Sequence, residues 1–262
     1  MNNQEKIDFI SNWISHYVNN MSNPAKSLII GISGGIDSAL TSTLSCLTGI
    51  ETIVLSLPIK TNSNTSDLSE THGKWLLKNF TNVTFETIDL TLIYNEFNSA
   101  LCNLNQYSDL GFANSKARLR MMTLYQVAAS NNGIVIGTGN KVEDFGVGFY
   151  TKYGDGGVDL SPIADLMKSE VYAIASFLEI NKEIQQAPPT DGLWGDDRTD
   201  EDQLGASYDE LEWAMNTVEI GKDINELHGR QKEVYQTYLK LNKSNQHKMN
   251  PIPVCMIPKK LQ

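Results

Sequence analysis

Apolar positions along the chain fall into two kinds of run, which predict strands and helices in alternation. Unbroken apolar runs occur at 28–32 and 133–137, and such runs are typical of strands buried on both faces of a parallel sheet. Residues 51–57 and 83–88 predict two further short strands. Between them, apolar residues recur every three or four positions, as in amphipathic helices. Helices are therefore expected at residues 4–19, from the residue after Gly35 through Leu47, at 67–80, 92–102, 112–130, 168–178 and 224–241, with one more opening at the capping box of 207–210.

This alternation predicts a single α/β domain over residues 1–262, with a parallel, twisted sheet wrapped by helices on both faces. The chain is long enough for one sizeable core, and no linker or internal repeat divides it. Ligands of such folds bind at the carboxyl ends of the strands. The loops after the first and fourth predicted strands are therefore the places to look for chemistry.

Two segments break the rhythm of strands and helices. Residues 145–166 hold five glycines among Lys152, Asp155 and Asp159, and a charged, glycine-dense loop of this length is more often functional than filler. Residues 187–202 combine two prolines, two glycines and six carboxylates, so they form a candidate lid. We expect 187–202 and the tail beyond Asn242 to become ordered only when substrates bind.

The stretch from Gly31 to Ser38 joins the first strand to its helix through Ser33-Gly34-Gly35. Its glycines let the backbone approach an anion, which the amides and the dipole of the helix N-terminus then face. Asp37, in the first helical turn, has the oxygen ligands that a divalent cation prefers. The stretch lacks the lysine of a Walker loop and the third glycine of a dinucleotide fingerprint, so neither scheme applies.

Charge and cysteine content narrow the classes of partner. The chain carries 31 acidic and 21 basic residues, a formal net charge of −10, which argues against binding to nucleic acid or to anionic membranes. Cys46, Cys102 and Cys255 are scattered without metal-binding spacing, and no signal peptide or apolar run long enough for a membrane span is present. We therefore expect reduced thiols and a cytoplasmic location.

Several motifs carry a resemblance to a known family. Ser33 to Ser38 reads Ser-Gly-Gly-x-Asp-Ser and resembles the PP-loop of ATP pyrophosphatases, which cleave ATP between the α and β phosphates. The later motifs are Asn-Ser-Lys-Ala-Arg at 114–118, Gly-Thr-Gly-Asn-Lys-Val-Glu at 137–143, Thr-Lys-Tyr-Gly-Asp-Gly-Gly-Val-Asp at 151–159, and His-Lys at 247–248. Together they resemble the NAD synthetase family over about residues 25 to 250.

The resemblance implies a ligase that amidates deamido-NAD with ammonia at the expense of ATP, through an adenylated intermediate, in a homodimer. ATP would contact Gly31, Ile32, Ser33, Gly34, Gly35, Ile36, Asp37, Ser38, Thr138, Lys168 and Thr190. Mg²⁺ would be held by Asp37 and Glu143, which with Lys168 form the implied catalytic set. Deamido-NAD would contact Arg118, Lys152, Asp159, His247 and Lys248.

One spacing departs from the family pattern. Many members place the metal-binding glutamate eight residues before the lysine of the Thr-Lys-Tyr-Gly-Asp motif, whereas Glu143 lies nine residues before Lys152 and Asp144 lies eight. Counted from Thr138, Glu143 keeps the expected spacing. We therefore expect Glu143 to be the ligand, with one inserted residue in the following loop and Asp144 as the alternative.

Lys168 lies at the start of a predicted helix, where a cation opposes the helix dipole, and we expect an anion to share its surroundings.

The chain begins about 25 residues before the first core strand. A glutaminase domain is therefore not expected, and the expected nitrogen donor is free ammonia or ammonia from a separate supplying subunit. Two alternatives remain: another PP-loop enzyme, of the amidotransferase or tRNA-modifying type, and a non-catalytic nucleotide sensor, which would bind ATP without turnover.

Overall fold

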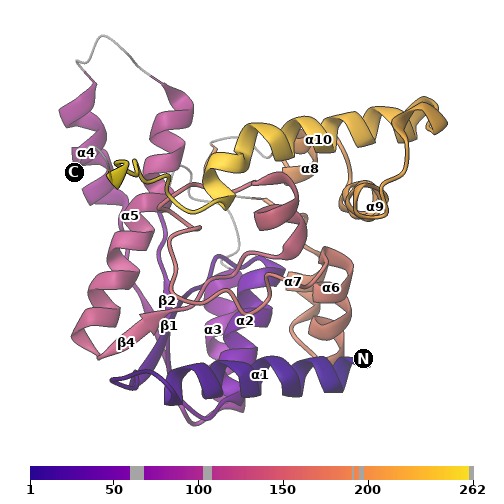
Figure 1. Ribbon diagram of the computed structural model, residues 1–262. Coiled ribbons are helices and arrows are strands. Elements are labelled where there is room, and N and C mark those ends of the chain that lie inside the picture. The colour runs from indigo at the N-terminus through magenta and orange to yellow at the C-terminus, as the bar shows by residue number, and fades with distance from the viewer. Residues whose placement is uncertain (60–67, 103–107, 191, 195–197, 260–262) are drawn as a thin grey trace.

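The computed structural model describes residues 1–59, 68–102, 108–190, 192–194 and 198–259. Over these residues the predicted parallel α/β fold is confirmed (Figure 1). The sheet has the strand order β3-β2-β1-β4, and every pairing in it is parallel. Its strands are β1 (Ser27–Gly31), β2 (Glu51–Ser56), β3 (Val83–Thr87) and β4 (Gly133–Val135).

Both faces of the sheet are covered, which explains why the central strand β1 is apolar without alternation from Leu28 to Ile30. Leu28 and Ile30 of β1 pack in one cluster with apolar residues of α1 (Asn3–Asn19), α2 (Ile36–Leu47), α3 (Leu68–Asn79) and α6 (Lys168–Phe177). Ile29, which points to the opposite face, packs in another cluster with residues of α4 (Thr91–Leu101) and α5 (Asp109–Ser130). All three β1 side chains are fully buried.

A further apolar cluster lies away from the sheet. It joins the π-helix η1 (Lys141–Val147) to α8 (Asp200–Leu204), α9 (Tyr208–Glu219) and α10 (Gly229–Met249), through residues such as Val142, Leu204, Leu211 and Val234. In Figure 1, α9 and α10 lie at the opposite end of the molecule from α1. Short helices α7 (Lys182–Gln186) and η2 (Ile224–Glu226) complete the described elements.

Three predicted boundaries are wrong. The helix expected from 112 begins at Asp109, because the Ser108 side chain caps it by accepting a hydrogen bond from the amide of Gly111 at 3.1 Å. The strand expected at 133–137 ends at Val135, beyond which Ile136 forms only a single bridge with Leu160. Residues 145–166 do not begin as a loop, because η1 continues to Val147.

The last helix is also longer than predicted. Instead of one helix at 224–241, the short η2 is followed by α10, which continues to Met249. The polar extension is held by the side-chain amides of Asn242 and Asn245, which donate to the carbonyls of Gly146 at 2.7 Å and Val147 at 2.8 Å.

Ordering of 187–202 and of the tail on substrate binding stays a prediction, and residues 191 and 195–197 lie outside the described ranges. In the part of the chain that the structure describes, no helix combines the length and apolar character that a bilayer crossing needs.

Candidate active site

The turn between β1 and α2 has the form that an anion-binding loop requires. Gly34 has a φ of +88°, and a Cβ there would lie 2.9 Å from Cβ of Leu68, so only glycine fits without strain. The hydroxyl of Ser38 closes the loop: it accepts a hydrogen bond from the amide of Ser33 at 3.2 Å and donates one to the carbonyl of Gly35 at 3.0 Å. Gly35 caps α2 without a side chain, which leaves the positive end of the helix open to an anion.

Beside this loop, three predicted site residues from different elements converge. The ammonium Nζ of Lys168 lies 2.6 Å from Oδ2 of Asp37 and 2.9 Å from Oε1 of Glu143. Lys168 is the first residue of α6 and is only 2% exposed. The two carboxylates are the anions that a buried lysine in this unfavourable dipole position needs. The structure thus brings Lys168 into contact with two other predicted site residues. Asp37 lies 131 positions from Lys168 in the sequence, and Glu143 lies 25 positions from it.

Burial and the shared cation set the protonation of this cluster. Burial raises the pKa of Asp37, although the charge of Lys168 opposes the rise. Burial acts in the same direction on Glu143, but the Lys168 ammonium and a hydrogen bond from Tyr208 outweigh it and lower the pKa of Glu143. Burial alone would lower the pKa of Lys168, but its two carboxylate partners raise it. At neutral pH the lysine is therefore charged and Glu143 is the more firmly ionised acid.

Two further residues hold the cluster in place, and the sequence reasoning assigned neither a role. The side-chain amide of Asn140 donates to Oδ1 of Asp37 at 2.9 Å, and its oxygen accepts from the amide of Glu143 at 3.1 Å. The hydroxyl of Tyr208 donates to Oε1 of Glu143 at 2.6 Å, and Nζ of Lys168 lies 4.6 Å from the centre of its ring. Asn140 lies within the 137–143 motif, and this membership was a usable signal, whereas Tyr208 only follows the Ser207 cap and carried no signal for the site.

Glu143 and Asp144 have different surroundings. Glu143 reaches Lys168, whereas Asp144 lies against Gly139, where a Cβ would be 2.1 Å from Oδ2 of the aspartate. Burial, reinforced by nearby carboxylates, raises the pKa of Asp144 to about 8. Asp144 is thus predominantly a neutral acid at pH 7, while Glu143 is ionised beside Asp37.

A second group of predicted residues gathers near the end of α10. Nε of Arg118 donates to the carbonyl of Lys152 at 3.2 Å, and Nζ of Lys152 donates to the carbonyl of His247 at 2.5 Å. Nζ of Lys248 donates to the carbonyls of Gly148 at 2.7 Å and Tyr150 at 2.8 Å. Through Lys152, the 151–159 motif therefore contacts both the 114–118 motif and the 247–248 motif.

The glycine-rich 151–157 turn is built onto α5. The hydroxyl of Thr151 donates to Oδ1 of Asn114 at 2.7 Å, and a Cβ on Gly154 would lie 2.8 Å from Cβ of Ala117. Asp155 accepts a hydrogen bond from the amide of Thr151 at 3.0 Å, and burial raises its pKa. Asp155 therefore has a structural role in the turn. Tyr153, 53% exposed and with a φ of +62°, is not packed in the core.

The remaining predicted residues are held by local contacts. Oδ2 of Asp159 accepts from the amide of Val135 at 2.8 Å, and its Oδ1 accepts from the hydroxyl of Tyr125 at 3.1 Å, so this carboxylate braces the end of β4. Thr190 accepts from the amide of Gly192 at 3.3 Å within its own segment. Thr138 is partly exposed in the connection between β4 and η1.

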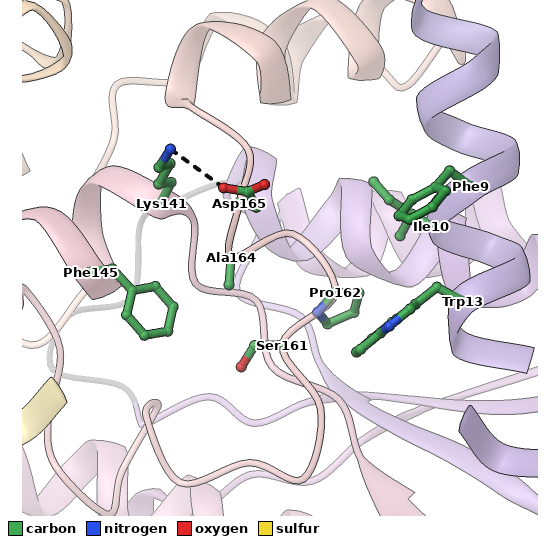
Figure 2. Close-up of a pocket in the computed structure, with 9 residues that line it drawn as sticks. All are labelled: Phe9, Ile10, Trp13, Lys141, Phe145, Ser161, Pro162, Ala164 and Asp165. Atoms are coloured by element: carbon green, nitrogen blue, oxygen red, sulfur yellow. Dashed lines mark ion pairs between the residues drawn. The ribbon is translucent and has the colours of Figure 1, made fainter. Parts of the chain in front are cut away.

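A cavity of about 410 Å³ lies on the outer side of η1, between this helix and α1 (Figure 2). Phe9 and Trp13 line it from α1 and Phe145 from η1, while Lys141 and Asp165 form an ion pair at 3.4 Å beside them. None of the sequence-predicted site residues lines this cavity. The cluster of Lys168, Asp37 and Glu143 is thus separate from the largely apolar hollow next to it.

Comparison with known proteins places this geometry in a family. A family model described as NAD synthase matches residues 6–252. The NH(3)-dependent NAD(+) synthetase of Syntrophomonas wolfei is 34% identical over 268 residues, with 100% of each chain covered. That of Alkaliphilus oremlandii is 41% identical over 217 residues, covering 79% of this chain and 83% of the relative. The structure of NMN synthetase from Francisella tularensis has a TM-score of 0.82 at 30% identity and covers 99% of both chains. The chain belongs to the NAD synthase family.

Proposed function

We propose that this protein is a ligase that forms a carbon–nitrogen bond, amidating deamido-NAD with ammonia to give NAD, AMP and pyrophosphate. The observation that carries the proposal is the Lys168 cluster, in which one buried ammonium and two carboxylates meet beside an anion-binding loop. The names of the S. wolfei and A. oremlandii relatives support the same reaction. The non-catalytic sensor is not favoured, because ATP binding alone does not require this triad.

The proposed chemistry proceeds in two steps. The nicotinate carboxylate of deamido-NAD is a poor acyl donor, because its leaving group would be oxide. An oxygen of this carboxylate therefore attacks the α-phosphorus of ATP, the bond to the bridging oxygen breaks, and pyrophosphate leaves with that electron pair. Ammonia then attacks the acyl carbon of the adenylate, AMP leaves, and loss of a proton gives the amide. The protein has to align two anions and neutralise developing negative charge rather than supply a nucleophile.

The loop and the lysine are the parts suited to ATP. We assign the phosphates to the N-terminus of α2, whose amides and dipole favour anions. Lys168 supplies the positive charge that the lysine of a Walker loop would provide to the phosphates. The proposed ATP-binding residues are Gly31, Ile32, Ser33, Gly34, Gly35, Ile36, Asp37, Ser38, Thr138, Lys168 and Thr190.

The residues of this cluster fit a magnesium ion. Mg²⁺ is usually held by one or two carboxylates together with substrate phosphates and water, and Asp37 and Glu143 already share one cation. The remaining ligands would come from the nucleotide phosphates and water. When bound, such an ion would neutralise charge on the leaving pyrophosphate. Asp37 and Glu143 would hold it, and Asn140 orients the carboxylate of Asp37 and fixes the backbone at Glu143.

Deamido-NAD is assigned to Asp159 together with the second group of residues, Arg118, Lys152, His247 and Lys248. Their contacts across α5, the glycine-rich turn and α10 favour one continuous site for a large anion. We further propose a homodimer and a cytoplasmic location, as the family resemblance implies, and a single domain that uses free ammonia.

A second candidate substrate is nicotinate mononucleotide. The Francisella tularensis structure, which covers 99% of both chains, is described as an NMN synthetase, and this supports amidation of the mononucleotide by the same two steps. The two substrates share the reacting nicotinate and differ in the adenylyl half. The residues of the Lys168 cluster would act alike on both.

One assay separates these possibilities. Purified protein is incubated with ATP, Mg²⁺ and either acid, using ammonium or glutamine as nitrogen donor, and the products are resolved by chromatography. The proposal expects NAD, AMP and pyrophosphate in equal amounts from deamido-NAD and ammonium, with no comparable rate from glutamine. A higher kcat/KM with nicotinate mononucleotide would assign the second substrate instead. No amide from either acid would refute the proposed function.

A further inference from the structure

Tyr208 lies where three charged side chains meet, two of them from the proposed site, yet none of the family motifs includes it. Its hydroxyl lies 2.6 Å from Oε1 of Glu143 and 3.3 Å from Oδ2 of Asp200, and its ring lies 4.6 Å from Nζ of Lys168. The side chain is 6% exposed. A buried phenol between two carboxylates and an ammonium has few alternative orientations.

The backbone around Tyr208 fixes this orientation. Ser207 caps α9 through a capping box with Glu210: the serine hydroxyl accepts from the amide of Glu210 at 3.3 Å, and the glutamate accepts from the amide of Ser207 at 3.0 Å. The amide of Tyr208 itself donates to Oε1 of Glu201 at 2.9 Å. The first turn of α9 is thus anchored at three points. This local structure directs the side chain of Tyr208 toward η1, in addition to the contacts that Tyr208 makes within the site.

A phenol has one hydrogen to donate, so its two acceptors are not equivalent. The 2.6 Å contact makes Glu143 the main acceptor, and Asp200 is a weaker one at 3.3 Å. Oε1 of Glu143 therefore receives the tyrosine hydroxyl and the ammonium of Lys168 together. The rotation of this carboxylate is fixed by two short, charge-assisted contacts.

We infer that Tyr208 is a positioning residue, which acts through Glu143 to hold that carboxylate in the orientation needed beside Asp37 and the ATP phosphates. The inference rests on the proposed function for the identity of the nucleotide. It adds a residue of α9, 65 positions from Glu143, to the machinery of the site. Tyr208 makes no covalent bond and transfers no proton in this role.

The test uses Tyr208→Phe, which keeps the ring beneath Lys168 and removes the hydroxyl alone. Tyr235→Phe is the matched control, because Tyr235 is 7% exposed and its hydroxyl donates to the carbonyl of Lys222 at 3.3 Å, with no contact to the site. ATP affinity is measured by calorimetry without acceptor, once with Mg²⁺ and once with EDTA. The ratio of the two affinities reports how well the metal-binding carboxylates are placed, independently of turnover.

In the otherwise wild-type protein, Tyr208→Phe is expected to reduce this ratio about tenfold, the typical effect of losing one hydrogen bond to a charged group. It should lower kcat by a similar factor while KM for deamido-NAD changes by less than about twofold, because the substrate site is untouched. Tyr235→Phe should leave the ratio and kcat unchanged. Thermal melting of both variants measures their stability. A purely structural role of Tyr208 would lower Tm but leave the ratio of ATP affinities unchanged.

A double-mutant cycle decides whether the effect passes through Glu143. In a Glu143→Gln background, Tyr208→Phe should change the ATP affinity ratio by less than about twofold, because the acceptor is already altered. An equal loss in both backgrounds, or an unchanged ratio in the single variant, would overturn the inference. A wild-type protein without any Mg²⁺-dependent gain in ATP affinity would overturn it as well. A wild-type protein that binds ATP in this way but forms no amide refutes the proposed function, and the binding cycle still decides the role of Tyr208.

Discussion

Replacing Lys168 by methionine removes the cation between Asp37 and Glu143 while keeping an unbranched side chain of similar length. The lysine side chain is 3% exposed, and those of the two acids are 17% and 15% exposed. The variant therefore leaves two carboxylates facing each other in a poorly solvated place. We expect a large loss of stability in the absence of Mg²⁺, as well as a loss of activity.

The magnitude follows from the two contacts at 2.6 and 2.9 Å. At an effective dielectric constant of about 20, each such pair has a Coulomb energy of about 6 kcal/mol. Desolvation of the three ions, at several kcal/mol each, offsets most of this gain. Breaking a buried pair by removing one partner costs about 3–5 kcal/mol, which for a chain of this size lowers Tm by roughly 10 °C.

The assay is urea unfolding in EDTA at pH 7, followed by circular dichroism. Lys168→Met is compared with the triple variant Asp37→Asn, Glu143→Gln, Lys168→Met, in which the cluster is uncharged. The triple variant should recover most of the lost free energy of unfolding, because replacing a buried charged group by neutral residues of similar volume is often nearly neutral. The loss in Lys168→Met should also shrink at pH 5, where the acids, without their cation, take up protons more readily.

An unfolding midpoint of Lys168→Met equal to that of the wild type would refute this reasoning. A triple variant as unstable as the single one would refute it too, because packing rather than charge would then account for the loss.

Three further outcomes are expected. Glu143→Gln should lower kcat at least about 100-fold and abolish the dependence of the rate on Mg²⁺. Asp144→Asn should keep the wild-type kcat and its dependence on Mg²⁺. Steady-state rates measured against Mg²⁺ concentration check both expectations. Because the pKa of Asp144 is raised from 3.8 to about 8, folding stability should fall as pH rises between these values. In Asp144→Asn, Tm should therefore depend less on pH between pH 6.5 and 8. Equal slopes of Tm against pH in the wild type and the variant would contradict this. His72 is buried, with a pKa lowered from 6.5 to about 4, so stability should fall as pH drops through that range, and His72→Phe should remove this dependence in thermal melts from pH 4 to 7.

The sequence contained enough information for the fold and for the charged centre of the site. Apolar runs without alternation predicted two-sided burial of β1, which the packing of Leu28 and Ile29 into opposite clusters confirms. The dipole argument predicted an anion near Lys168, and two are found there. Both inferences worked because the physical signal is local, either a run of side chains or a charge at a helix end.

The supporting contacts could not be predicted, because they depend on tertiary approach. Asn140 reaches Asp37 across 103 positions and Tyr208 reaches Glu143 across 65, and no periodicity encodes such pairs. The end of α10 was missed for a related reason. Residues 242–248 contain no large apolar residue, so the amphipathic pattern stops, yet Asn242 and Asn245 anchor this turn to η1 through backbone carbonyls.

The nine-residue spacing from Glu143 to Lys152 has a structural explanation in η1. We expected the extra residue after the glutamate, and there residues 141–147 form a π-helix, whose i→i+5 hydrogen bonds take more residues per turn than an α-helix. An extra residue in a helix is absorbed by such a widened turn without rotating the residues before it. Glu143, close to the Asn140 cap, therefore keeps its direction toward Lys168, and the adjustment falls on the residues that follow it. Glu143 as the metal ligand, which the spacing counted from Thr138 favours, therefore stays our prediction, and its ion pair with Lys168 beside Asp37 supports it over Asp144.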